Sequence, residues 1–274
     1  QVDSVILVID AANGVEEQTE KLMEVCRMRD IPVLIFVNKL DREGKDAFDL
    51  LDELEEKLDI KVRPLAWPIG IGADFKGVYN IHKQELNLFD SNKTEIEKDI
   101  VKITDINDQQ IDDILGSQGE VLRSDLELIE GVYDDFEPEE YEKAQIAPVF
   151  FGSALYNFGV QELLESFIEL APSPLSRPTN QGDIEPERED FSGFIFKIHA
   201  NLDPNHRNRL AFLRVCSGTF KRNTFYKHVR AGKNFKFSNP YTFMAQSKLV
   251  VEEAFPGDVV GLYDLSLIHI SERA

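Results

Sequence analysis

The chain has 274 residues, of which 42% are hydrophobic and 29% are charged, and its formal net charge is −20. This composition is typical of a soluble globular protein with one or two domains. It excludes a membrane-spanning protein, because no apolar run approaches the roughly 20 residues that such a helix needs, and no segment resembles a secretory signal.

The charge is divided unevenly along the sequence. Residues 1–190 hold 18 basic and 44 acidic side chains, a formal charge of −26, whereas residues 191–274 hold 12 and 6, a formal charge of +6. Such a sign change suggests two modules with different partners. Cys26 and Cys216 lie far apart in sequence and fit a reducing, cytoplasmic setting, with Cys26 predicted to pack in the core.

The first sixty residues alternate between apolar runs and amphipathic stretches. Residues 4–10 and 33–37 predict buried strands, and residues 16–30 and 46–58 carry apolar side chains at helical spacing. Buried strands that alternate with such helices predict a parallel sheet with helices on its faces. The predicted buried positions of the two helices are Val15, Thr19, Leu22, Met23 and Cys26, followed by Ala47, Leu51, Leu54 and Leu58.

The tetrapeptide Asn38-Lys39-Leu40-Asp41 follows the second predicted strand and has the form of a guanine-specificity element. The Asp41 carboxylate accepts two parallel hydrogen bonds, which matches the N1–H and N2–H donors of guanine. Adenine lacks this donor pair, and a site built for it discriminates by roughly 10⁴-fold. Asn38 is expected to tie the base to the loop backbone, and the aliphatic stem of Lys39 to cover the base. Ligands of open α/β sheets bind at such strand ends.

The pattern is interrupted at residues 66–145. This stretch contains Trp67, several glycines, polar segments and an acidic helical stretch around residues 118–136. We interpret it as a subdomain inserted on the surface of the α/β domain. The predicted buried side of its acidic helix carries Leu122, Leu126, Ile129 and Tyr133.

The α/β pattern resumes with a predicted strand at residues 146–151 and a predicted helix at residues 159–170. Between them lies Gly152-Ser153-Ala154-Leu155. Backbone N–H groups of a Ser-Ala turn can donate to guanine O6, and the alternative is an ordinary strand-to-helix turn. The presence of the first motif at the end of another strand in the same sheet favours the nucleotide site. The helix is predicted to turn inward Val160, Leu163, Leu164 and Phe167.

The last third of the chain has a different character. Residues 172–190 carry four prolines among polar residues and predict a linker. From Phe191 the apolar period falls to two, and turn signals recur at residues 217–218, 231–232 and 256–257. Short alternating strands with such turns predict a small antiparallel β-barrel over residues 191–264. The alternating apolar positions are Phe194, Phe196, Ile198, Leu210, Phe212 and Val215.

The segment from Val5 to Gly44 and the Gly152–Leu155 turn together resemble the guanine-nucleotide domain of the translational GTPases. The interval of 115 residues between Asn38 and Ser153 is similar to that of elongation factor G and release factor 3, which carry an inserted subdomain. Small Ras-like GTPases have a much shorter interval. The resemblance covers residues 1–264. It implies a P-loop-NTPase-like parallel-sheet domain over residues 1–171, truncated at its N-terminus, followed by an incomplete antiparallel barrel.

Three stretches are more similar to the peptide chain release factor 3 branch of this family than to elongation factor G. They are residues 67–70 with 75–79, residues 148–160 and residues 194–207. The last is the most specific, because it carries Ala-Asn-x-Asp-Pro-x-His-Arg at residues 200–207. This resemblance implies a GTPase that promotes the departure of codon-reading class one release factors from the ribosome. It implies GTP or GDP with Mg²⁺, and guanine contacts by Asn38, Lys39, Asp41, Ser153, Ala154 and Leu155.

The phosphate-binding part of such a site is missing from the sequence. No G-x-x-x-x-G-K-[ST] occurs, so the phosphate cradle, its lysine and the Mg²⁺-binding hydroxyl are absent. The D-x-x-G at residues 41–44 overlaps the guanine motif and is not expected to bind Mg²⁺. The family's phosphate loop and switch segments are expected upstream of Gln1, so no catalytic residue is assigned. Residues 265–274 depart from the family pattern and are predicted to be a non-native tail.

The basic barrel is the predicted ribosome-facing region. Residues 197–236 hold ten Lys or Arg side chains and a single acidic residue, Asp203. His206, Arg207 and Arg209 are expected to contact ribosomal RNA phosphates, whereas no membrane, DNA or metal partner is expected. Two alternatives stay open. One is another ribosomal GTPase, such as elongation factor G or a ribosomal protection protein, and the other is a non-catalytic guanine-binding interaction protein.

Overall fold

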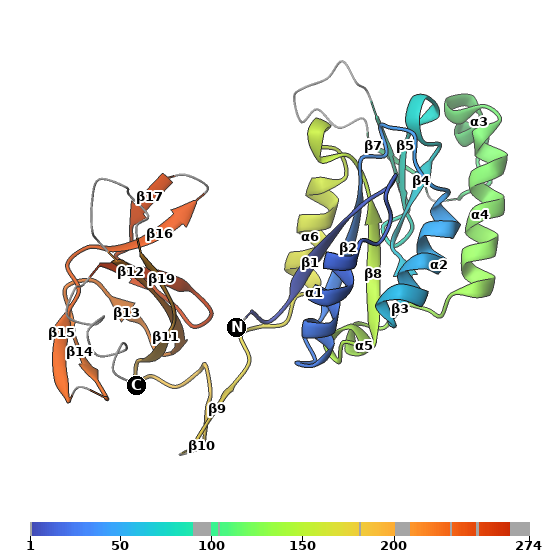
Figure 1. The fold of residues 1–274 in the computed structure, drawn as a ribbon. Helices are drawn as coiled ribbons and strands as arrows, with labels where there is room; N and C mark the ends of the chain where they lie inside the picture. The colour runs from blue at the N-terminus through green and yellow to red at the C-terminus, as the bar shows by residue number, and fades with distance from the viewer. Residues whose placement is uncertain are drawn as a thin grey trace. The chain divides into compact units, whose positions relative to one another are not determined.

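A computed structural model describes residues 2–89, 100–103, 105–180, 182–200, 209–230, 232–244 and 247–263 (Figure 1). The chain divides into two compact units, Gln1–Pro172 (unit 1) and Ser173–Ala274 (unit 2). Unit 1 combines helices with a parallel sheet, and the strands of unit 2 pair antiparallel in its larger sheet and ladders. The predicted fold class, an α/β domain followed by antiparallel strands, is therefore confirmed.

Unit 1 is built around a four-stranded parallel sheet with the order β1-β2-β8-β3. Strands β2 and β8 lie at its centre, and their side chains are buried on both faces, which explains why both read as continuous apolar runs. Within the described residues β1 pairs with β2 alone, and Val8 on β1 is 55% exposed. The strands are β1 (Val5–Asp10), β2 (Val33–Asn38), β3 (Lys61–Pro64) and β8 (Ile146–Phe151).

Helices α1 (Glu17–Arg27) and α2 (Ala47–Leu58) form the connections from β1 to β2 and from β2 to β3. Both connections run in the same direction along the sheet, so right-handed crossovers place both helices on one face, where they contact each other. The Asp46 side chain caps α2 by accepting a hydrogen bond from the Phe48 amide at 2.9 Å.

Most of the residues predicted to be buried on the helices of the α/β pattern are at least partly buried. Leu51, Leu54 and Leu58 of α2 are fully buried, and Cys26 lies in the core as predicted. Two predictions are wrong, because Leu22 of α1 is 51% exposed and Leu164 of α6 (Val160–Leu170) is 47% exposed. Each has an apolar neighbour that takes the buried position. Consecutive residues point about 100° apart around a helix, so a helix that packs on one side buries only one of the two.

The inserted region shares the hydrophobic core of unit 1. It contains an antiparallel sheet with the order β4-β5-β6-β7, which the sequence did not predict. The predicted acidic helix is α4 (Gln118–Val132), and its Leu122 and Ile129 are buried. The other elements are β4 (Ala66–Ile69), η1 (Gly72–Asp74), β5 (Gly77–Asn80), β6 (Glu85–Leu88), β7 (Ile100–Lys102), α3 (Gln109–Leu115) and α5 (Pro138–Glu142).

Unit 2 has a five-stranded antiparallel sheet with the order β11-β12-β19-β16-β17 and three two-stranded ladders. Within the predicted linker, residues 177–184 form one of these ladders. A β-bulge in β11 between Ile195 and Lys197 shifts the alternation, so Ile195 packs on the core while Phe194 is 36% exposed. The larger sheet contains β11 (Ser192–Ala200), β12 (Arg209–Ser217), β16 (Pro240–Met244), β17 (Ser247–Val250) and β19 (Val259–Tyr263). The ladders contain β9 (Arg177–Thr179), β10 (Gly182–Ile184), β13 (Phe220–Lys221), β14 (Phe225–His228), β15 (Lys233–Lys236) and β18 (Glu253–Ala254).

Candidate guanine-nucleotide site

The two predicted guanine motifs meet at the carboxyl edge of the parallel sheet. Strands β2 and β8 are neighbours in register, with Val37 opposite Phe151, so the two motifs leave the sheet side by side. The Gly152 amide donates to the Val37 carbonyl at 2.9 Å, and the Leu40 amide donates to the Gly152 carbonyl at 3.2 Å. Segments that lie more than 100 residues apart in sequence therefore form one hydrogen-bonded edge.

Asn38 connects the two loops through its side chain. Its Oδ1 atom accepts a hydrogen bond from the Ala154 amide at 2.8 Å and another from the Lys39 amide at 2.8 Å. Lys39 adopts a left-handed backbone conformation, with φ of 71°. A conformation of this kind costs free energy in a non-glycine residue, and here the Asn38 side chain holds the backbone amide that follows it. Asn38 thus fixes the geometry of both motifs.

Asp41 lies beside the second motif. The buried hydroxyl of Ser153 donates to Asp41 Oδ1 at 2.5 Å, and the Asp41 side chain is 10% exposed. Asp41 Oδ2 lies 3.8 Å from Arg42 Nε, beyond hydrogen-bond distance. The carboxylate is therefore oriented by a neutral donor and keeps acceptor capacity at the surface. A fixed carboxylate of this kind is the acceptor that the two N–H donors of guanine require.

The backbone amides of the second motif have partners within the protein. The Ser153 amide donates to the Phe158 carbonyl at 3.0 Å, and the Ala154 amide donates to Asn38. Both amides that were expected to reach guanine O6 are thus engaged within the protein. The Leu155 amide lies in the first turn of η2 (Ala154–Tyr156), where a helix supplies no acceptor for it. Leu155, whose side chain is 70% exposed, is the position in this motif best placed to donate to a base.

Asp10 borders the candidate site and was not predicted from the sequence. It ends β1 opposite Asn38, and its Oδ2 accepts a hydrogen bond from Lys39 Nζ at 2.5 Å. Its Oδ1 accepts a second hydrogen bond from the Ala12 amide at 2.9 Å. The bond from Lys39 is the main cause that lowers the pKa of Asp10 below its usual value. The sequence contained a signal for this position, because Asp10 ends one predicted strand and Asn38 directly follows the next, and the carboxyl ends of neighbouring parallel strands lie side by side.

Replacing Lys39 by Met is expected to raise the pKa of Asp10 toward its ordinary value. A carboxyl group with a lowered pKa stabilises the fold above its unfolded-state pKa, and that contribution is lost as the pH falls through the folded-state pKa. The variant should therefore lose less stability on acidification than the parent. An NMR pH titration of Asp10 measures the shift. Lys21→Met, which removes the partner of Glu17 instead, is the control; an unchanged Asp10 titration in Lys39→Met would contradict the pairing.

Two neighbouring residues hold the site backbone in place. A Cβ atom on Gly152 would lie 2.4 Å from the Phe158 carbonyl oxygen and 2.9 Å from the Phe36 ring, so the turn that begins the second motif requires glycine at this position. Leu40 is buried, and its carbonyl accepts a hydrogen bond from the Gly72 amide at 2.8 Å. The first motif is thus fixed both to the second motif and to the inserted region.

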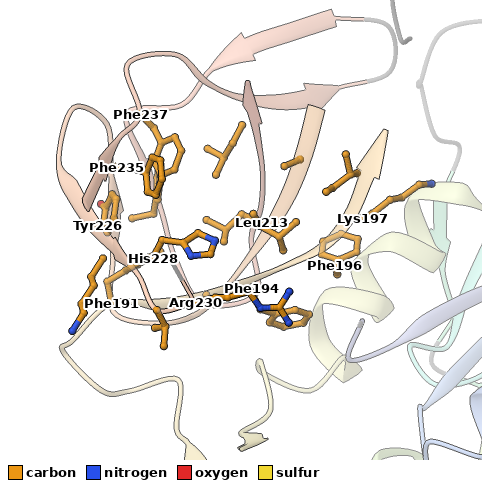
Figure 2. Close-up of a pocket in the computed structure, with 18 residues that line it drawn as sticks. Phe191, Phe194, Phe196, Lys197, Leu213, Tyr226, His228, Arg230, Phe235 and Phe237 are labelled. Atoms are coloured by element: carbon orange, nitrogen blue, oxygen red, sulfur yellow. The ribbon is translucent and has the colours of Figure 1, made fainter. Parts of the chain in front are cut away.

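The described residues line two cavities of interest. One, of about 330 Å³, adjoins the first motif and is bordered by Asp10, Asn13, Asn38 and Lys39 among others. The other, of about 570 Å³, lies in unit 2, and several aromatic side chains line it (Figure 2). Its labelled lining residues are Phe191, Phe194, Phe196, Lys197, Leu213, Tyr226, His228, Arg230, Phe235 and Phe237.

The arrangement at this sheet edge suits the base of a guanine nucleotide. Asp41 and Leu155 supply an acceptor and a donor at one edge of the sheet. Across the described ranges, no three His, Cys, Asp or Glu side chains gather in a way that could hold a metal ion. The sequence also lacks the phosphate loop whose hydroxyl binds Mg²⁺.

The predicted ribosome contacts are largely outside the described part of the chain. His206 and Arg207 lie outside the described residues, and Arg209 is the first residue of β12. No helix in the described ranges is long and apolar enough to cross a membrane.

Two families of known proteins match the chain. Residues 1–173 match the elongation factor Tu GTP binding domain, and residues 190–273 match elongation factor G domain 2. The second match includes most of residues 265–274, so the non-native origin of that tail stays a prediction.

A crystal structure of a protein from Thermus thermophilus is similar to this chain, with a TM-score of 0.68 and 22% sequence identity. The similarity covers 96% of this chain and 39% of that chain, so this chain spans well under half of that protein. At this identity the likeness shows a shared fold. The elongation factor Tu match extends over more than half of the sequence, and the chain belongs to the translational GTPases.

Proposed function

We propose that this chain is part of a translation termination factor that binds GTP in the cytoplasm and hydrolyses it on the ribosome. The observation that carries guanine recognition is the hydrogen bond from the Ala154 amide to Asn38, which joins the two predicted guanine motifs at one sheet edge. Asp41, oriented by Ser153, supplies the acceptor for the base. Lys39, held by Asp10, supplies an aliphatic stem that can cover it.

The termination role is supported by sequence similarity to release factor 3 at residues 67–70 with 75–79, at residues 148–160 and at residues 194–207. In this role, GTP hydrolysis promotes the departure of class one release factors after the peptide has been released. Mg²⁺ would be bound by residues outside this sequence. An elongation-factor role is the competing assignment, because the matched family descriptions name elongation factors.

A reconstituted termination assay with the protein encoded by the complete gene tests this proposal. The expected result is GTP-dependent acceleration of class one release factor dissociation from ribosomes that have released their peptide. The control is a translocation assay with the same protein. Translocation activity without any effect on release factor dissociation would overturn the termination role and favour elongation.

The chain itself is expected to hydrolyse no GTP and to bind little GDP at micromolar concentration. Contacts to the base alone lack the hydrogen bonds to phosphate oxygens that a phosphate loop provides. Titration with a fluorescent GDP analogue measures this, with the matching ADP analogue as the control for dye binding. Saturable GDP binding in the micromolar range would show that the chain contains phosphate contacts that its sequence does not reveal.

A further inference from the structure

Four aromatic rings join the inserted region to the turn that carries the second guanine motif. Phe75 and Phe89 come from the inserted region, and Tyr156 and Phe158 belong to the turn. The Phe89 ring centre lies 5.0 Å from that of Phe75. It lies 5.4 Å from the ring centres of both Tyr156 and Phe158, and it meets each of these rings edge to face at 78°. Phe89 therefore contacts the other three rings of the cluster.

The turn has little structure of its own. Ser153 and Phe158 close it with two hydrogen bonds, in which each amide donates to the other residue's carbonyl, at 3.0 and 2.9 Å. Between them lies the single turn of η2, where Leu155 is 70% exposed and Tyr156 is 37% exposed. One helical turn is not stable without packing. The contacts of Tyr156 and Phe158 with Phe89 supply packing on the side of the turn that faces the inserted region.

Phe89 is itself held by the backbone of the inserted region. Its amide donates to the Lys76 carbonyl at 2.8 Å, and the Lys76 amide donates to the Ile69 carbonyl at 2.8 Å. The segment between β4 and β5 also contacts the first motif, through the hydrogen bond from the Gly72 amide to the Leu40 carbonyl. The inserted region therefore contacts both loops of the candidate guanine site.

We propose that Phe89 is a positioning residue for guanine recognition, which acts through Tyr156 and Phe158. By packing on the turn, it keeps the Leu155 amide in a fixed relation to the Asp41 carboxylate on the other loop. A base that bonds to both groups binds more tightly when they are fixed in advance, because less conformational entropy is lost on binding. The inference rests on the proposed guanine site and adds that the inserted region sets the affinity of that site.

Titration of the ¹⁵N-labelled full chain with millimolar guanosine tests the proposal. Phe89→Ala is expected to weaken guanosine binding by about 2- to 12-fold, the range that one aromatic pair contributes to an equilibrium constant. Hydrogen exchange of the Ser153 and Ala154 amides, measured without nucleoside, should become faster by a similar factor relative to that of the Phe150 amide in β8. Phe89→Tyr keeps the ring and should restore both values. Phe89→Leu keeps most of the apolar volume without the ring, so it should resemble Phe89→Ala at a smaller cost in stability.

The matched control is Phe136→Ala, which removes another partly buried ring of unit 1. The Phe136 ring lies 6.4 Å from that of Tyr141 in α5, the helix that precedes β8, whereas the guanine motif follows β8. The control should lower the melting temperature without weakening guanosine binding by the folded chain. A residue that only packs in the core would behave in the same way.

The inference is overturned if guanosine binding and amide exchange in Phe89→Ala and Phe89→Leu equal those of the parent, or if Phe136→Ala weakens binding as much. An absence of guanosine shifts in the parent would overturn the guanine site itself, and this inference with it. A failed termination assay would leave the result standing, because no ribosome or release factor enters the measurement.

Discussion

Replacing Asp41 by Asn is expected to abolish the preference of this chain for guanosine over adenosine. The substitution is isosteric and keeps the Oδ1 atom that accepts the Ser153 hydrogen bond, so the loop should keep its geometry. It removes the charge and one acceptor that face the N1–H and N2–H donors of guanine. A hydrogen bond to a charged group contributes about 1.5–3 kcal/mol, so guanosine binding should weaken by roughly 10- to 150-fold.

The measurement uses ¹⁵N-labelled protein and millimolar nucleosides, because base contacts alone bind weakly. In the parent chain, guanosine should shift the amide resonances of residues 38–41 and 153–155, and adenosine should not. In Asp41→Asn the guanosine shifts should disappear. Xanthosine, which presents an acceptor where guanine carries its amine, should then be favoured over guanosine. Asp59→Asn, at an exposed ion pair with Arg27, is the control. Retention of the guanosine shifts in Asp41→Asn would exclude Asp41 as the base acceptor.

Replacing Trp67 by Ala is expected to lower the free energy of unfolding of unit 1 by about 3–5 kcal/mol. Trp67 is 1% exposed, and its ring lies 4.6 Å from that of Phe48 and 5.7 Å from that of Phe151. Its Nε1 also donates to Asp125 at 2.9 Å. The substitution leaves a cavity beneath β8 and removes the partner of a partly buried carboxylate. Domains of this size are stable by about 5–15 kcal/mol, so the loss is a large fraction of the total.

Denaturant unfolding followed by circular dichroism measures this loss. Leu128→Ala, at a 51%-exposed position of α4, is the control and should change stability by less than about 0.5 kcal/mol. Trp67→Phe keeps an aromatic ring in the core but removes the Nε1 donor to Asp125, so its loss of stability reports mainly the hydrogen bond. Burial raises the pKa of Asp125 and the Trp67 hydrogen bond lowers it, so Trp67→Phe should raise that pKa further. If Trp67→Ala costs no more than the control, Trp67 does not anchor the inserted region.

Much of this architecture follows from local sequence pattern. Continuous apolar runs specified β1, β2 and β8 of the parallel sheet, whereas β3, with only four residues, was not predicted. Helical spacing placed Leu51, Leu54 and Leu58 in the core. The antiparallel sheet of the inserted region was missed, because its strands have only three or four residues and show no sustained alternation. The exposure of Leu22 and Leu164 was missed because spacing identifies an apolar stripe without showing how much of it a neighbour covers.

The sequence by itself determined the two segments predicted to bind guanine, the absence of a phosphate-loop pattern and the sign change in charge between the two parts of the chain. These are properties of residue identity and spacing. Only the tertiary structure decided which groups of the motifs stay available to a base. In the folded chain, the Ser153 and Ala154 amides donate hydrogen bonds to acceptors within the protein, and Asp10 accepts a hydrogen bond from Lys39. Hydrogen bonds between segments distant in sequence depend on strand order and register, which the sheet as a whole fixes and no single segment encodes.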